Sequence, residues 1–287
     1  MISKDLISHI SEILNNKVLQ VRSIGGGDIS EISLLKTECH PYILKTNQSS
    51  NALKLFLAEK LGLEAISNTN TIATPKIFAC DTYQGHAFLL MEYIESKSPS
   101  PKDLSLFGEQ LANLHSNTQS DFGFTKNNFI GRLDQSNTNH NTWTSFYVKE
   151  RLLPQLHLAQ SKSLLSPKEI PSEKQLIEGS SLLFNTIKPS LLHGDLWSGN
   201  YLISSEGIPY LIDPAVYYGH YEVDIAMSRL FGGFGTEFYE AYHGHYPTSA
   251  ETEARIKLYQ LYYLLVHLNM FGSSYYGSVQ QILTTMF

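Results

Sequence analysis

Two carboxylates and one amide each follow a short apolar run in the second half of the chain. The apolar pair 191–192 leads through a His-Gly turn to Asp195, and Asn200 stands five residues later. Asp213 follows the apolar run 210–212. In phosphoryl transfer, one carboxylate receives the proton of the attacking hydroxyl, while an amide oxygen and a second carboxylate hold Mg²⁺ on the phosphates of a nucleotide. The pattern makes Asp195 a candidate base and makes Asn200 and Asp213 candidate metal ligands.

An ordinary turn between two strands is the alternative for this stretch, because an Asp and an Asn at this spacing are common. The complete series is more specific: strand, tight glycine turn, Asp195, Asn200, second strand and Asp213 follow in order. The catalytic loop of protein kinases has the same spacing between its Asp and its Asn, followed by a metal-binding Asp. Chance rarely supplies the whole order.

A glycine-rich turn near the N-terminus separates two strand-like runs, 18–24 and 29–37. The turn consists of Gly25, Gly26, Gly27 and Asp28. The backbone N–H groups of such a hairpin can cover nucleotide phosphates. A plain β-turn is the alternative, and the turn is not a Walker A loop, because no Gly-Lys-Ser/Thr follows.

Lys45 ends a third strand-like run, 41–46, at the place of the phosphate-binding lysine in a kinase β3 strand. A strand-end lysine that points to water is the alternative. A helix is expected over 52–66, and in a kinase-like lobe one of its acids pairs with the lysine. We expect Glu59, near the middle of the helix, to be that acid and Glu64 to be a solvated surface charge.

The apolar run 86–93 is expected to be a strand that ends in a hinge, where the backbone atoms of Glu92 and Ile94 would meet adenine. The Ser-, Pro- and Lys-containing segment 95–101 then marks the lobe boundary. We expect a nucleotide-binding lobe over 1–94 and a catalytic and substrate lobe over 102–287.

Helical spacing of apolar residues dominates the second half of the chain, so the fold class is α+β with a larger, mostly helical C-terminal lobe. The small lobe is expected to be an antiparallel β lobe with helices over 3–15 and 52–66. The helices expected in the large lobe are 103–116, 143–160, 172–187, 222–231, 236–242, 250–271 and 277–285. The polar stretch 116–141 is long for a structureless loop, which favours a functional insert.

Composition excludes several classes of function. The chain has 287 residues, 42% hydrophobic and 17% charged, with a net charge of −6, so we expect a globular protein that binds no nucleic acid. No apolar run approaches the roughly 20 residues of a membrane span, and no signal peptide is recognisable. Cys39 and Cys80 are the only cysteines. We therefore expect a cytoplasmic protein without a membrane partner, and we take it to be a monomer.

Several motifs together resemble the fructosamine kinase (ketosamine-3-kinase) family, over nearly the whole chain. The motif 193–200 carries the signature His-Gly-Asp-Leu-Trp-Ser-Gly-Asn, and its Trp197 separates this family from the aminoglycoside and choline kinases. Further matching segments are 122–124, 130–131, 143–156, 218–234 and 267–272.

This resemblance implies a two-lobed, protein-kinase-like fold and ATP-dependent phosphorylation of a sugar hydroxyl of a ketosamine, a deglycation-repair reaction. It implies that Asp195 is the base, that Asn200 and Asp213 hold Mg²⁺, and that Lys45 with Glu59 orders the phosphates. Trp197 and His267 become candidates for substrate contact. For Trp197 the alternative is core packing below the loop, and for His267 it is a satisfied histidine in a buried helix.

Two positions depart from related patterns. Residues 213–215 read Asp-Pro-Ala where protein kinases have Asp-Phe-Gly, so the switch based on Phe packing should be absent. Tyr221 stands where the family more often has Arg, whereas Asp224 fits its place and is expected to anchor the catalytic loop. The competing functions are a related kinase for an aminoglycoside, choline or a sugar, and a nucleotide-binding pseudokinase.

Overall fold

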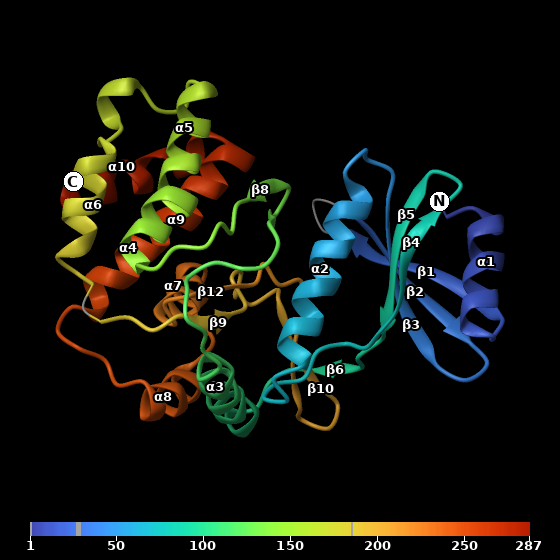
Figure 1. Ribbon diagram of the computed structural model, residues 1–287. Helices are drawn as coiled ribbons and strands as arrows, with labels where there is room; N and C mark the ends of the chain where they lie inside the picture. Colours follow the sequence, from blue (N-terminus) through green and yellow to red (C-terminus); the bar gives the residue numbers. More distant parts are fainter. Residues whose placement is uncertain (1, 27–29, 185) are drawn as a thin grey trace.

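The computed structural model describes residues 2–26, 30–184 and 186–287, which form two lobes (Figure 1). The small lobe is an antiparallel sheet of order β1-β2-β3-β5-β4 with a helix on each face, which confirms the predicted fold of this half. Its elements are α1 (Lys4–Leu14), β1 (Val18–Gly26), β2 (Glu31–Thr37), β3 (Pro41–Asn47), α2 (Ala52–Ser67), β4 (Ile77–Tyr83) and β5 (His86–Glu92).

Alternation along β5 explains why helices cover both faces of this sheet. Phe88 and Leu90 point to the face that α1 covers, while Leu89 and Met91 point to the face that α2 covers. Successive side chains of a strand leave opposite faces of the sheet, so an uninterrupted apolar run requires apolar partners on both sides. Helix α2 therefore lies between the sheet and the large lobe (Figure 1).

The chain crosses between the lobes through β6 (Ser96–Lys97), which pairs with β10 (Tyr201–Ser204) of the large lobe. Helix α3 (Pro101–His115) follows, and its start is set by a capping box between Ser100 and Asp103, with Pro101 in the first turn. The proposed boundary at 95–101 stays a prediction.

The large lobe is built around α9 (Thr252–Phe271), whose side chains are buried on nearly all sides. Besides α3, further α-helices of this lobe are α4 (Trp143–Phe146), α5 (Leu153–Ser161), α6 (Glu173–Ser181), α7 (Glu222–Leu230), α8 (Thr236–His245) and α10 (Tyr276–Met286). Short strands supply the catalytic segments: β9 (Ser190–Leu192) pairs with β12 (Tyr217–Gly219), and β10 pairs with β11 (Pro209–Leu211).

Two predicted helices differ from the structure. The helix expected over 143–160 is continuous, but a π-helical stretch, Tyr147–Leu152, separates α4 from α5. The helix expected over 172–187 ends at Ser181, and Leu182 is 85% exposed. Leu183, Phe184 and Ile187 still pack against the core beyond the end of the helix, so the apolar pattern alone placed this end too late.

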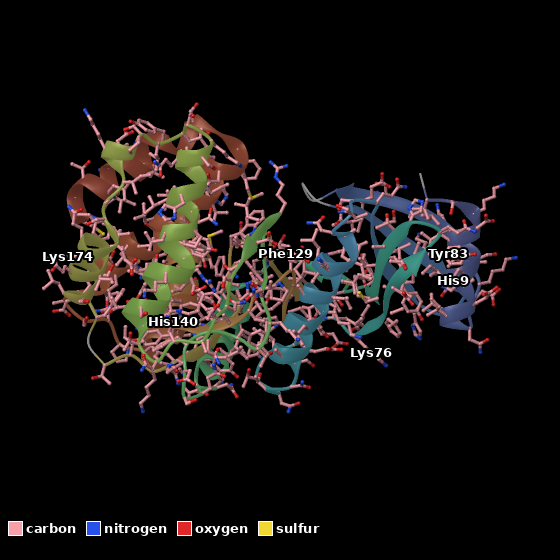
Figure 2. All side chains as sticks on the ribbon, turned by 45° about the horizontal axis from the view of Figure 1, so that its top comes forward. His9, Lys76, Tyr83, Phe129, His140 and Lys174 are labelled. Carbon is pink, nitrogen blue, oxygen red and sulfur yellow. The ribbon has the colours of Figure 1, made fainter. Side chains whose placement is uncertain are left out.

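The polar stretch 116–141 contains a β-hairpin, β7 (Asn128–Ile130) and β8 (Leu133–Gln135). The hairpin packs against α2 of the small lobe, and Figure 2 shows Phe129 at the boundary between the lobes. On its other side, Gly131 approaches α9 so closely that an added Cβ would lie 2.7 Å from the Met270 side chain. The stretch is thus an ordered insert that bridges both lobes.

Within the described part of the chain, no helix combines the length and the apolar content needed to cross a bilayer.

Replacement of Gly108 by alanine should destabilise the large lobe, because α3 and α8 cross at this glycine. An added Cβ would lie 2.3 Å from the Phe238 carbonyl oxygen, so the helices would have to move apart. We expect Gly108→Ala to lower the free energy of unfolding by about 1–3 kcal/mol in urea denaturation. Gly244→Ala in α8 is the matched control, because nothing lies within 4 Å of its added Cβ. Equal stability of the two variants would contradict the close crossing.

Candidate active site

The catalytic loop after β9 is held by a buried carboxylate from α7. The Asp224 carboxylate accepts the backbone N–H of His193 at 2.7 Å and that of Gly194 at 2.8 Å. It also lies 3.1 Å from His115 Nε2, and its side chain is fully buried. A carboxylate that accepts several donors in a dry site fixes their direction strongly. This confirms the predicted anchoring role of Asp224.

Glycine is the one residue type that fits position 194 of the loop. Its φ is +84°, a conformation that residues with a Cβ rarely adopt, and an added Cβ would lie 2.1 Å from the Ala215 carbonyl oxygen. The loop therefore turns against the segment that follows Asp213. The Gly194 carbonyl oxygen accepts the hydroxyl of Tyr263 from α9 at 2.8 Å.

The ring of His193 joins the two acidic segments. Its Nε2–H donates to the Ile212 carbonyl oxygen at 2.8 Å, and its Nδ1 accepts the backbone N–H of Asp195 at 3.2 Å. Burial lowers the pKa of His193, so the ring is neutral and can act as donor on one side and acceptor on the other. Ile212, which precedes Asp213, and the backbone N–H of Asp195 are therefore both hydrogen-bonded to the His193 ring.

Asn200 is bonded to Asp195 through its amide nitrogen. Nδ2 donates to the Asp195 backbone oxygen at 2.8 Å and to Asp195 Oδ2 at 3.2 Å. Burial, followed by the charge of Asp213, raises the pKa of Asp195 to about 7, although the hydrogen bond from Asn200 opposes the shift. A carboxylate with this pKa is suited to accept a proton near neutral pH. Because the amide nitrogen of Asn200 makes these bonds, its amide oxygen is the atom that could coordinate a cation.

Lys45 joins both lobes through two carboxylates. Its Nζ lies 2.7 Å from Glu59 Oε1 of α2, and it also contacts Asp213 Oδ1. Burial alone would lower the pKa of Lys45, but the two carboxylates outweigh burial and raise it. Burial raises the pKa of Glu59 to about 8 in spite of Lys45. Burial would also raise the pKa of Asp213, but Lys45 outweighs it and holds that pKa below its ordinary value.

The predicted pairing of Lys45 with Glu59, rather than with Glu64, is confirmed by this geometry. Glu64 is half exposed and faces Lys60 of its own helix, with the nearest N and O atoms 3.8 Å apart. The alternative of a solvated strand-end lysine is excluded, because the Lys45 side chain is 9% exposed.

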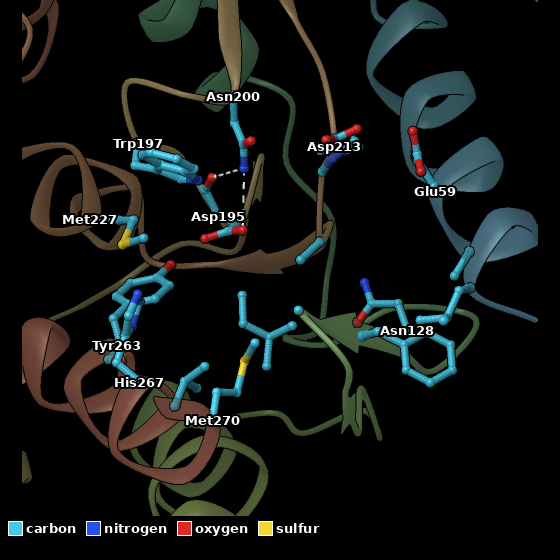
Figure 3. Close-up of a pocket in the computed structure, with 18 of the residues that line it drawn as sticks. Glu59, Asn128, Asp195, Trp197, Asn200, Asp213, Met227, Tyr263, His267 and Met270 are labelled. Carbon is cyan, nitrogen blue, oxygen red and sulfur yellow. Dashed lines mark hydrogen bonds between the residues drawn. The ribbon is translucent and has the colours of Figure 1, made fainter. Parts of the chain in front are cut away.

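A cavity of about 580 Å³ collects these groups between the lobes (Figure 3). Lys45, Glu59 and Asp213 line one side, and Asp195 and Asn200 line the wall formed by the catalytic loop. The far half is apolar and largely aromatic, with Met227, Phe231, Tyr263, Met270, Phe271 and Tyr275. The structure therefore offers a charged half for phosphates and an apolar half for an acceptor.

Trp197 and His267 both line the apolar half (Figure 3). Trp197 is 39% exposed and its ring lies over Gly199, so it does not pack in the core below the loop. His267 Nδ1–H donates to the Tyr263 carbonyl oxygen at 2.7 Å. Burial lowers the pKa of His267, which favours the neutral ring with an acceptor at Nε2. Contact of either side chain with substrate stays a prediction.

The predicted adenine and phosphate contacts are only partly described. Gly25 and Gly26 end β1 and pair with β2, while Gly27 and Asp28 lie outside the described residues. Ser30, just beyond them, lines the cavity.

The predicted hinge lies at the end of the small-lobe sheet. The backbone N–H of Glu92 donates to the Lys76 carbonyl oxygen at 2.8 Å, so only its carbonyl oxygen could meet adenine. Ile94 is buried. Neither residue lines this cavity, and their adenine contact stays a prediction.

Asn128, Tyr263 and the two methionines of the cavity were missed by sequence reasoning. Tyr263 precedes His267 by four residues on one predicted helix, so helical spacing could have placed both on the same face. Asn128 lies in the polar stretch 116–141, where the sequence showed no periodic signal that selects one amide among many.

The chain matches the fructosamine kinase family over residues 2–287. It is 41% identical over 285 residues to an Enterococcus faecium protein named "Probable ketoamine kinase", an alignment that covers 97% of this chain and 99% of that relative. It is 40% identical over 275 residues to the chloroplastic protein-ribulosamine 3-kinase of Oryza sativa subsp. indica, covering 93% and 78% of the two chains.

The solved structures agree. A Haemophilus somnus protein named "Putative fructosamine-3-kinase" superimposes with a TM-score of 0.88 at 27% identity, over 98% of this chain and 96% of that one. Aminoglycoside phosphotransferase APH(4)-Ia shares the fold alone, with a TM-score of 0.63 at 13% identity and coverage of 97% and 98%. The two-lobed, kinase-like α+β fold is thereby confirmed. The chain belongs to the fructosamine kinase family and is an ATP-dependent phosphotransferase.

Proposed function

We propose that the protein transfers the γ-phosphoryl group of ATP to a sugar hydroxyl of a ketosamine, the early adduct of a sugar with an amine or a lysine. The observation that carries this proposal is the cavity in which Lys45, Asp195, Asn200 and Asp213 meet beside an aromatic acceptor half. The names of the curated relatives support a ketosamine as the acceptor.

Asp195 is the base in this proposal. Its carboxylate accepts the proton of the attacking hydroxyl while the new O–P bond forms and the bond to the β-phosphate bridging oxygen breaks. His193 and Asn200 hold Asp195 in place through the backbone and the side chain. Lys45 supplies positive charge for the phosphates, with Glu59 fixing its position.

Asn200 and Asp213 are the residues that would hold Mg²⁺. An amide oxygen and a carboxylate are hard oxygen donors of the kind that Mg²⁺ takes, with substrate phosphates and water completing its octahedron. The bound ion would neutralise charge on the transferred phosphoryl group.

The composition of the acceptor half argues against an aminoglycoside acceptor. Among the described cavity residues, the acids are Glu59, Asp195 and Asp213, all of which have roles at the phosphates or at the reacting hydroxyl. A polycation would need further carboxylates, whereas a sugar ring can stack on Trp197 and on its neighbours.

A panel of acceptors tests the proposal directly. Fructosyl-, ribulosyl- and erythrulosyl-amines, an aminoglycoside, choline and free sugars would be compared in a coupled ADP assay, with the phosphorylated product identified by mass spectrometry. Turnover of a ketosamine above all other acceptors is the expected result. ATP binding without ADP release in the presence of any acceptor would instead indicate a pseudokinase.

The cytoplasmic location and the monomeric state of the protein stay predictions.

Asp195→Asn should abolish turnover and leave ATP binding largely intact. The asparagine oxygen can still accept from Asn200, so the shape of the loop is kept while the base is lost. We expect kcat with ATP and a fructosamine to fall by about 10²–10⁴-fold. Calorimetry would measure ATP affinity, with the exposed Asp134→Asn in the hairpin as control. An unchanged kcat would remove Asp195 from the role of base.

Activity should fall on the acid side of neutrality. The base must be ionised, and the pKa of Asp195 is about 7, so protonation removes the active form as the pH drops below that value. We expect kcat/KM to decrease about tenfold per pH unit below the pKa. A flat profile between pH 7 and pH 5 would contradict the assignment. Unfolding monitored by circular dichroism over the same range separates titration from denaturation.

Asp213→Ala should remove the Mg²⁺ dependence of nucleotide binding, because the carboxylate is one of the two proposed metal ligands. Titration of ADP into the variant with and without Mg²⁺ should give similar, weak affinities, whereas the parent chain should bind ADP more tightly with Mg²⁺. Asp134→Ala serves as the control. Parent-like Mg²⁺-dependent affinity in Asp213→Ala would refute the metal role.

A further inference from the structure

A group of buried polar side chains lies between the β7–β8 hairpin and the segment that follows Asp213. Asn128 is 6% exposed, Gln135 2%, Asn137 1% and Arg151 fully buried. Buried amides are tolerated where their donors and acceptors are matched, and such a network holds its members in one arrangement. The proposed phosphoryl-transfer mechanism uses none of these four residues.

The hydrogen bonds run in one direction. Arg151 Nη2 donates to Asn137 Oδ1 at 2.7 Å, Asn137 Nδ2 donates to Asn128 Oδ1 at 3.0 Å, and Asn128 Nδ2 donates to the Val216 carbonyl oxygen at 2.8 Å. A guanidinium only donates and a carbonyl only accepts, so each amide between them has a single orientation. We call this series, Arg151 to Val216, the amide relay.

A second amide supports the end of the amide relay. Gln135 Nε2 donates to Asn128 Oδ1 at 2.8 Å and to the Ala215 carbonyl oxygen at 3.3 Å. The Tyr262 hydroxyl of α9 donates to Gln135 Oε1 at 2.5 Å, which fixes the direction of this amide as well. Two successive carbonyl groups after Asp213 are therefore held by side chains of the hairpin.

The segment held in this way carries backbone strain. Asp213 has a φ of +53°, an uncommon conformation for a residue with a side chain. On the opposite edge, the Ala215 N–H donates to the His193 carbonyl oxygen at 2.8 Å. A strained residue persists when its surroundings hold it from several sides. Asn128 and Gln135 supply one of these sides, and the catalytic loop supplies the other.

Arg151 begins the amide relay from an unusual setting. The guanidinium lies over the rings of Tyr217 at 3.9 Å and Phe146 at 4.6 Å, and it donates to the Ser136 carbonyl oxygen at 2.6 Å as well as to Asn137. Its described partners are rings and neutral oxygens rather than a carboxylate. The charge therefore strengthens the hydrogen bond to Asn137 without being neutralised there.

We propose that Asn128, supported by Asn137 and Arg151, is a positioning residue for phosphoryl transfer, and that the amide relay holds Asp213 in its active conformation. The relay takes the place of the Phe-based switch that the Asp-Pro-Ala sequence lacks, so the site is assembled without an activating modification. This inference rests on the proposed metal role of Asp213.

Two isosteric variants that add the same charge test the proposal. In Asn128→Asp the donor to the Val216 carbonyl is lost, so kcat and Mg²⁺-dependent ADP affinity should each fall on the order of 10²-fold, while KM for the ketosamine changes little. In Asn137→Asp the donor to Asn128 is lost, but Arg151 gains a carboxylate partner. This variant should keep or raise its Tm and still lose kcat by roughly tenfold.

Asn141→Asp, an exposed change on the same segment, is the matched control and should behave as the parent chain. The proposal is overturned if Asn128→Asp retains the parent kcat and ADP affinity, or if the losses in both relay variants simply follow a lower Tm. Asp213→Ala is measured in parallel. If Mg²⁺ dependence survives in that variant, the metal role fails and this inference fails with it. If Asp213→Ala loses its Mg²⁺ dependence but both relay variants behave as the parent chain, the metal role of Asp213 holds and the relay proposal fails.

Discussion

The shared contact of Lys45 with Glu59 and Asp213 is the interaction on which the rest of the structure depends. It joins β3, α2 and the segment at Asp213 of the large lobe, so a single ammonium group connects both lobes at the cavity. The side chains of Lys45 and Glu59 are 9% and 15% exposed, and removal of Lys45 would leave two neighbouring carboxylates without their cation. This contact therefore fixes how the two lobes meet at the cavity.

The packing of α2 against the large lobe follows from this contact. Gly62 of α2 comes so close to Pro214 that an added Cβ would lie 2.9 Å from the proline ring. The β7–β8 hairpin touches the same helix from the other side of the cavity. The helix that supplies Glu59 is thus held by the segment after Asp213 and by the hairpin, and the small lobe is positioned by the residues that also form the active site.

The large lobe gives the catalytic loop its shape mainly through backbone groups. Asp224 binds two successive N–H groups, His193 bonds both acidic segments, and Tyr263 holds the Gly194 carbonyl. The protein-kinase-like fold thereby places Asp195 on a rigid turn, while the apolar half of the cavity is built from Met227 of α7, from side chains of α9 and from aromatic residues in the segments that follow these helices. Charged and apolar side chains are thus separated within a single cavity.

Local patterns in the sequence determined much of the fold and the charged half of the site. Apolar runs that end at Lys45, Asp195 and Asp213 placed these residues at strand ends, and helical spacing placed Glu59 on the inner helix. These signals are local, because strand alternation, helix periodicity and turn residues act over a few neighbouring positions.

Only the tertiary structure decided whether Trp197 lies in the core or in the cavity. Only the tertiary structure showed that the backbone N–H of Glu92 is already bonded to the Lys76 carbonyl oxygen. It also decided where the helix after residue 172 ends and which amide of the polar insert bonds to the segment after Asp213. Asn128 meets Val216 across 88 residues of sequence. Such contacts depend on how distant segments pack, and no local pattern encodes them.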